Sequence, residues 1–108
     1  MDIQLKRGLL EICVLAAIKN EESYGYRIIK DVAPFVEISE STLYPILRRL
    51  EAGELLTVRS AEHNGRLRKY YRITEAGRAR LAEFTSEWAE IMAISQFVTK
   101  EGNGNEKE

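Results

Sequence analysis

The chain has 108 residues, of which 44% are hydrophobic and 31% are charged, and its formal net charge is −1. These values are typical of one small globular domain and exclude a disordered or fibrous chain. The sequence has no apolar run of membrane-spanning length and no pattern of a secretory leader, so we expect a cytoplasmic protein without a membrane partner.

Charge is distributed unevenly along the chain. Residues 39–80 contain nine basic and five acidic side chains, a net of +4, whereas residues 81–108 contain two basic and six acidic ones, a net of −4. Surface charges more than about 8 Å apart are largely screened at physiological salt, so the central segment can attract phosphate despite the acidic end. The net charge therefore does not exclude nucleic acid as a partner.

The first two predicted helices cover residues 4–18 and 24–32. The first is apolar around most of its circumference, which predicts burial in a core and contact with a second subunit. Its Cys13 is expected to be a small core residue, since one cysteine cannot form an internal disulfide. Ser23 is the predicted N-cap of the second helix, and Gly25 is expected to admit a neighbouring backbone.

The third predicted helix covers residues 39–52. Its apolar residues fall at positions i, i+3, i+4 and i+7 and form one arc that can face a core. These residues are Leu43, Ile46, Leu47 and Leu50. Two helices, a short link and a third helix form the helix-turn-helix layout, in which the third helix occupies the position that contacts DNA.

Both ends of the third helix have sequence signals. Ser39 or Ser41 is the predicted N-cap, and Gly53 is the predicted left-handed residue that ends the helix. Pro45 removes one hydrogen bond of the helix and is expected to bend or loosen its start. The link before the helix, residues 35–38, is expected to form a strand-like turn.

The next segment predicts a β-hairpin. Residues 55–61 and 67–73 favour extended backbone, and Asn64-Gly65 between them is the strongest short signal for a hairpin turn. From residue 59 to residue 72 the hairpin carries five basic side chains and one acidic one. A basic hairpin after a helix-turn-helix indicates a wing that grips the phosphate backbone or enters a minor groove. The alternative is a solvated hairpin whose charges only protect an edge strand.

The last predicted helix begins after Thr74 and runs to about Val98. Six of its residues follow alternating steps of three and four, the spacing of a coiled-coil seam: Leu81, Phe84, Trp88, Ile91, Ser95 and Val98. We expect this seam to have no cover in its own chain, so it predicts a homodimer.

The predicted fold class is α+β and mainly α, a winged helix-turn-helix with a C-terminal dimerisation helix. The predicted domains are a DNA-binding head at residues 1–75, a dimerisation helix at residues 76–99 and a disordered tail at residues 100–108.

Several motifs in this order resemble the PadR family of transcriptional regulators, of the short type with a single C-terminal helix. The matching pieces are Gly8-Leu9-Leu10-Glu11, Tyr24-Gly25-Tyr26, Ser41-Thr42-Leu43-Tyr44-Pro45 and Arg68-Lys69-Tyr70-Tyr71-Arg72-Ile73-Thr74 followed by Gly77. The resemblance implies a dimeric winged-helix repressor that binds inverted-repeat operators and is often released by a small phenolic or hydrophobic effector.

The expected DNA contacts combine hydroxyls and cations on the third helix, the second helix and the hairpin. These residues are Tyr24, Tyr26, Ser41, Thr42, Tyr44, Arg48, Arg66, Arg68 and Lys69.

Trp88 has two interpretations. As a structural residue it stabilises the dimer seam by burying a large ring. The resemblance also implies that it matches the tryptophan with which multidrug-sensing members bind flat ligands. In that case Phe84, Trp88, Ile91 and Met92 form an effector site for a planar aromatic compound, with Glu87 and Glu90 favouring a cation.

Two other classes of function compete with a DNA-binding regulator. A winged-helix module for protein–protein interaction is the alternative, because the acids Glu40, Glu51 and Glu54 lie near the third helix. An enzyme is disfavoured, since His63 is the only histidine and neither a nucleophile pair nor a phosphate-binding glycine loop is present. We expect no cofactor and no metal ligand.

Overall fold

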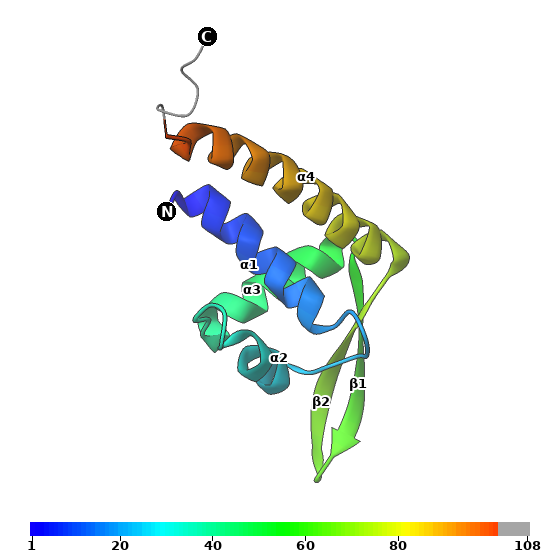
Figure 1. The fold of residues 1–108 in the computed structure, drawn as a ribbon. Helices are drawn as coiled ribbons and strands as arrows, with labels where there is room; N and C mark the ends of the chain where they lie inside the picture. Colours follow the sequence, from blue (N-terminus) through cyan, green and yellow to red (C-terminus); the bar gives the residue numbers. More distant parts are fainter. Residues whose placement is uncertain (102–108) are drawn as a thin grey trace.

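A computed structural model describes residues 1–101 of the chain (Figure 1). Its elements are α1 (Ile3–Ala17), α2 (Gly25–Val32), α3 (Glu40–Ala52), β1 (Leu56–His63), β2 (Arg66–Ile73) and α4 (Glu75–Thr99). The three short helices pack together, the two strands form an antiparallel hairpin beside them, and α4 runs along α1 and beyond it. The predicted fold class, mainly helical with a winged helix-turn-helix and a long C-terminal helix, is confirmed.

One hydrophobic core joins the three short helices to the base of the hairpin. Each element contributes side chains that are almost fully buried, among them Val14, Ile28, Leu43, Leu56 and Tyr71. The predicted apolar arc of α3 faces this core. Cys13 lies at the margin of the core and is only partly buried, and this burial raises the pKa of its thiol.

The start of α2 differs from the sequence prediction. Tyr24 is the N-cap residue and makes no side-chain cap, so the prediction of Ser23 as N-cap is wrong. The Ser23 backbone instead pairs with Tyr71 of β2: its N–H donates to the Tyr71 carbonyl at 3.0 Å, and its carbonyl accepts from the Tyr71 N–H at 2.7 Å. The hairpin therefore pairs with the backbone of Ser23, the residue before the N-cap of α2.

The link between α2 and α3 is not strand-like. The N–H groups of Phe35 and Val36 both donate to the Val32 carbonyl, at 2.9 and 3.1 Å, and continue α2 as a tight turn. The expected strand-like turn at residues 35–38 is therefore wrong, because local hydrogen bonds satisfy this backbone.

Ser39 is the N-cap of helix α3 and its side chain accepts from the Thr42 N–H; the helix continues through Pro45. At its other end Gly53 has a φ of −85°, so the prediction that it is left-handed is wrong. Glu54 takes that conformation, with a φ of 62°. The Glu54 N–H donates to the Glu51 carbonyl and the next N–H donates to the Leu50 carbonyl, both at 2.9 Å. This is the Schellman arrangement, reached one residue later than the glycine.

The hairpin turn is the one that the sequence predicts. Asn64 and Gly65 both have positive φ, of 53° and 80°, as a two-residue type I′ turn requires. The strands extend right up to this turn, with His63 opposite Arg66 and Leu56 opposite Ile73.

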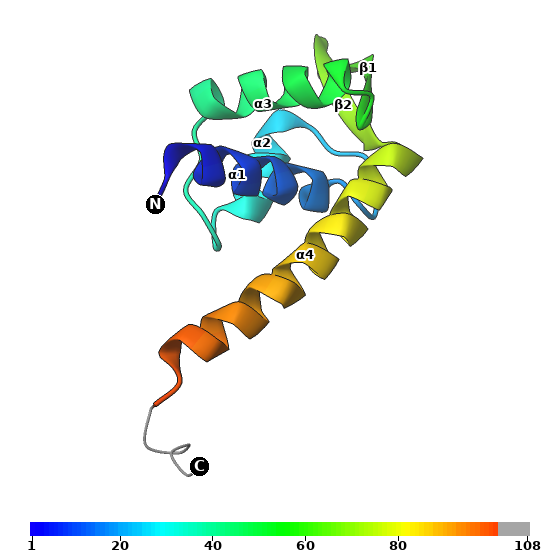
Figure 2. The same cartoon turned by 90° about the horizontal axis from the view of Figure 1, so that it is seen from above.

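Helix α4 is fixed at its start, and its last turns are exposed within residues 1–101. The Thr74 hydroxyl accepts from the Gly77 N–H at 3.0 Å and donates to the Glu54 carbonyl at 2.8 Å. A Cβ on Gly77 would meet the Leu55 carbonyl, so only glycine allows this approach. Figure 2 shows α1 lying between α3 and α4, while the end of α4 extends away from the head.

The expectation that nothing in the chain covers the α4 seam is therefore wrong for its first half, because α1 packs along it. The distal residues Ile94, Phe97 and Val98 are exposed.

Among residues 1–101, no helix combines the length and the apolar character that crossing a bilayer requires. The predicted disordered tail lies outside the described residues from residue 102 onward.

Replacing Glu54 by Gly is expected to stabilise the fold. A left-handed conformation costs a non-glycine residue roughly 1–2 kcal/mol, and part of this gain is offset because glycine is freer in the unfolded chain. We expect the free energy of unfolding in urea to rise by about 0.5–1 kcal/mol. Ala52→Gly, in the last turn of α3, is the matched control and should lower it by about 1 kcal/mol. A neutral or destabilising Glu54→Gly would contradict the assignment.

Candidate nucleic-acid interface

The outward face of α3 carries the polar residues expected at DNA. Ser41, Thr42 and Arg48 are exposed, and Tyr44 is 38% exposed. The opposite face of the helix is buried in the core. The helix therefore presents hydroxyls and a guanidinium to solvent without exposing its apolar arc.

A groove of about 740 Å³ separates the wing from the start of α2 and from α3. Six of the nine predicted DNA contacts line it together: Tyr24, Tyr26, Tyr44, Arg66, Arg68 and Lys69. Of the other three, Arg48 lines an adjoining groove with Tyr44 and Lys69. Thr42 lies on the far flank of α3, beside α1, and the Ser41 hydroxyl lies 3.0 Å from the Ser39 hydroxyl.

Gly25 fixes how closely α2 approaches the groove wall. A Cβ at this position would meet the Tyr44 hydroxyl and lie 3.1 Å from Cζ of the same ring. The sequence predicts a close neighbour at Gly25, but that neighbour is an aromatic side chain of α3 and not a backbone. The glycine thus lets the hydroxyl end of a predicted DNA-contacting side chain approach the start of α2 closely.

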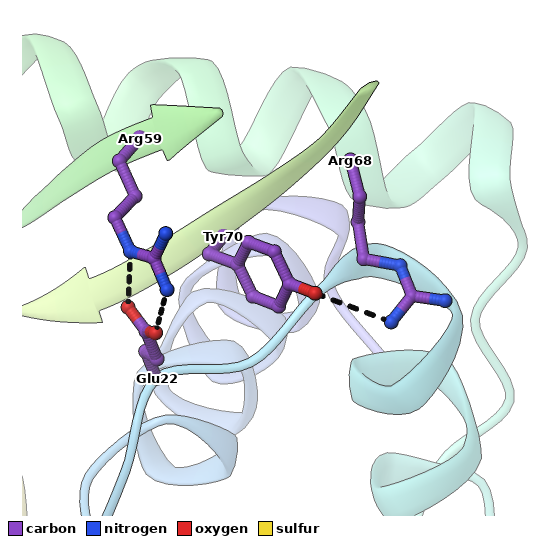
Figure 3. A network of polar contacts seen from close by, with 4 residues as sticks. All are labelled: Glu22, Arg59, Arg68 and Tyr70. Carbon is purple, nitrogen blue, oxygen red and sulfur yellow. Dashed lines mark hydrogen bonds and ion pairs between the residues drawn. The ribbon is translucent and has the colours of Figure 1, made fainter. Parts of the chain in front are cut away.

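Arg68 is held by two tyrosine rings. Its guanidinium lies 3.8 Å from the centroid of the Tyr24 ring and 5.8 Å from that of Tyr70, and Nη1 donates to the Tyr70 hydroxyl at 3.4 Å. Figure 3 shows Arg68 reaching past the end of the Tyr70 ring. This cation–π contact joins the wing to α2 and fixes the guanidinium at the groove wall.

A second link lies at the base of the wing. Arg59 of β1 binds Glu22 through both carboxylate oxygens, with Nε 3.0 Å from Oε1, and its guanidinium lies 4.7 Å from the Tyr70 centroid (Figure 3). The hydrogen bond from Arg59, aided by its positive charge, lowers the pKa of the Glu22 carboxyl below its ordinary value. The two residues are 37 positions apart in the sequence.

With the Ser23–Tyr71 bridge, these links tie the wing to the segment before α2 at three points. Burial raises the pKa of the Tyr71 phenol, which lies beneath the groove. Glu22, Arg59 and Tyr70 were absent from the predicted site. Basic residues and tyrosines can be counted in a sequence, but no local spacing indicates which of them will pair.

The ion pairs separate two groups of basic residues. Arg27, Arg49, Arg59 and Arg80 each pair with a carboxylate. Within residues 1–101, the four basic residues of the predicted interface form no ion pair: Arg48, Arg66, Arg68 and Lys69. The cations that face the groove are therefore available to an anionic partner.

Three of the four predicted effector residues line a separate groove, between α1 and α4. Phe84 and Trp88 stack with ring centroids 5.8 Å apart, and both line a groove of about 200 Å³ with Ile91. Leu5, Leu9 and Ile12 of α1 form its other wall, with Arg80 and Glu87 also lining it. Met92 and Glu90 are not among the lining residues. In residues 1–101 no cluster of three or more potential metal ligands is found.

These features define a winged helix-turn-helix protein with a long C-terminal helix. The chain belongs to the PadR-like family of transcriptional regulators, whose family model matches residues 14–83. The family is one of regulators and not of enzymes, and the resemblance drawn from the sequence is confirmed.

Three relatives illustrate the match. A transcriptional regulator of Mycobacterium tuberculosis is 35% identical over 81 residues, which cover 74% of this chain and 76% of that protein. A PadR-like transcription factor of Bacteroides fragilis has a crystal structure with a TM-score of 0.80 and 32% identity, covering 89% of this chain and 95% of that one. Bacillus subtilis PadR, solved in complex with operator DNA, shares the fold at a TM-score of 0.68 and 23% identity, covering 71% and 46% of the two chains.

The Glu22–Arg59 pair should make stability depend on pH. Because the pKa of Glu22 is lowered in the folded state, the pair stabilises the protein above the ordinary carboxyl pKa and loses its effect as pH falls through the folded value. We expect the difference in unfolding free energy between the native chain and Glu22→Gln, measured in urea, to be largest at neutral pH and to shrink from about pH 5 downward.

Glu62→Gln is the matched control for this series. Glu62 lies in the same hairpin, forms no ion pair within residues 1–101, and should give a difference that varies less with pH. Equal pH profiles for the two variants would contradict the role assigned to Glu22.

Proposed function

We propose that this protein binds operator DNA as a homodimer and represses transcription. The observation that carries the proposal is that the unpaired cations of the wing line two adjoining grooves together with Tyr44 and Arg48 of α3. In this arrangement Ser41, Thr42, Tyr44 and Arg48 contact base edges and phosphates in the major groove. The operator complex of Bacillus subtilis PadR, which has the same fold, supports DNA as the partner.

The wing and α2 position the head on the phosphate backbone. Arg66 lies beside the hairpin turn and Lys69 faces α3, so both can reach phosphate oxygens. Tyr24 and Tyr26 supply hydroxyls from the start of α2. Arg68 contributes its charge from its position beside the Tyr24 and Tyr70 rings.

Dimerisation is proposed through α4. Its exposed apolar side chains include Ile91, Met92, Ile94, Phe97 and Val98, and α1 adds Ile3 and Leu5. Burying this surface against a second copy would stabilise a dimer, at about 25 cal/mol for each Å² of apolar area removed from water. Two heads held in this way would contact half-sites about 34 Å apart in an inverted repeat. The division into a head at residues 1–75 and a dimerisation helix at residues 76–99 is part of this proposal.

A planar aromatic effector is proposed for the groove that Phe84 and Trp88 line. The stacked rings offer a flat aromatic surface, and Glu87 favours a cationic compound. Because α1 forms the other wall, a ligand there would change the angle between α4 and the head, and hence the spacing of the two α3 helices.

Binding to a duplex from the region upstream of its own gene tests the main proposal. We expect saturable, salt-dependent binding by fluorescence anisotropy, with two chains per duplex in sedimentation. Arg66→Gln should weaken binding to all duplexes. It should also lower by about one the salt slope, which is the slope of the logarithm of the binding constant against the logarithm of the salt concentration. Lys19→Gln, an exposed lysine at the end of α1, is the control. A single chain per duplex, or tight binding to a protein partner that salt does not affect, would contradict the proposal.

Quenching of the single tryptophan tests the effector site. Titration with proflavine, a planar aromatic cation, is expected to quench Trp88 fluorescence with a saturable curve. Phe84→Leu should weaken binding by about tenfold, because it removes the stacked ring, whereas Met92→Leu should have little effect since Met92 does not line the groove. Equal effects of the two variants would argue for a different site.

A further inference from the structure

The start of α1 meets the start of α3 in a second groove, on the flank of α3 that faces away from the wing. The groove measures about 240 Å³. Its walls are Ile3, Lys6, Arg7 and Leu10 from α1, and Thr42, Pro45, Ile46 and Arg49 from α3. Figure 2 shows the starts of α1 and α3 on the same side of the molecule. A predicted DNA-contacting residue, Thr42, thus has two cations of α1 beside it.

These two cations are available. Lys6 and Arg7 are exposed and form no ion pair within residues 1–101. The neighbouring carboxylates are occupied: Glu11 binds Arg49 at 3.0 Å, and Asp2 caps α1 by accepting from the Leu5 N–H at 3.0 Å. The start of α1 therefore presents positive charge that no role described so far uses.

The dimensions of a DNA major groove place phosphates where this charge can bind them. Thr42 and Tyr44 are two residues apart, so they lie roughly 160° apart around the helix axis. A helix about 10–12 Å across fills a major groove about 12 Å wide, which leaves a row of phosphates along each flank. The wing, beside Tyr44, supplies cations on one flank, and Lys6 and Arg7 supply them on the other.

We propose that Lys6 and Arg7 bind the DNA phosphate backbone on the flank of α3 opposite the wing. This inference rests on the proposed DNA binding and adds α1 to the interface, which the sequence motifs confine to α2, α3 and the hairpin. With cations on both flanks, α3 is held between the two strands of the duplex, and the register of its base contacts is fixed from both sides.

The test compares two double variants of the full chain. Lys6→Gln with Arg7→Gln is expected to weaken binding to the upstream duplex by about tenfold at moderate salt and to lower the salt slope by about two. The matched control is Lys19→Gln with Arg78→Gln, which removes the same two residue types from exposed sites outside the three grooves beside α3. It should leave the slope within about half a unit. Lys6→Arg with Arg7→Lys keeps both charges and should keep the native slope.

Three results would overturn the proposal. If the Lys6→Gln with Arg7→Gln variant has the same salt slope as the control variant, the two cations do not contact phosphate. A loss of slope that accompanies dissociation of the dimer in sedimentation would assign them to subunit association. If the native chain itself shows no salt-dependent binding, the proposed function fails as well, and this outcome is distinct from failure of the α1 contact alone.

Discussion

The attachment of the hairpin to the segment before α2 is the constraint on which the proposed DNA-binding surface depends. An isolated two-stranded hairpin is marginally stable in water, so its position must be set by other elements. Here the Ser23 backbone pairs with Tyr71, Glu22 binds Arg59, and Arg68 lies on the Tyr24 ring. The surface links are individually weak, but they act on both strands of one hairpin. Together they fix the angle between the wing and α3, and so the width of the groove between them.

The basic side chains of this protein fall into two groups, those that pair with carboxylates and those that do not. Two of the arginines that pair with carboxylates link separate elements: Arg49 links α3 to α1, and Arg59 links the wing to the segment before α2. Among residues 1–101, six of the cations without such partners line the grooves beside α3: Lys6, Arg7, Arg48, Arg66, Arg68 and Lys69. This division explains how a chain with a net charge of −1 can present a positive surface, since phosphate responds to the local patch.

The first part of helix α4 packs on the head and its last part is exposed, and the coiled-coil spacing of its apolar residues does not distinguish the two parts. Its first turns pack on the head, where Gly77 approaches the Leu55 carbonyl and Leu81 contacts the core. Its last turns carry exposed apolar side chains. A ligand between Phe84 and α1 would lie where these two parts meet. Any change in the helix angle there would be transmitted to the head, because the start of α4 is fixed by Thr74 to the end of α3.

The sequence by itself determined the order and type of the elements, the hairpin turn at Asn64-Gly65 and the family. These are local signals: apolar period, turn chemistry and short motifs. Tertiary structure alone decided that Glu54, and not Gly53, ends α3, that Ser23 pairs with a strand in place of capping a helix, and that α1 covers half of the α4 seam. It also decided which arginines are paired. Such choices depend on contacts between residues tens of positions apart, and these contacts outweigh local preferences of about 1 kcal/mol.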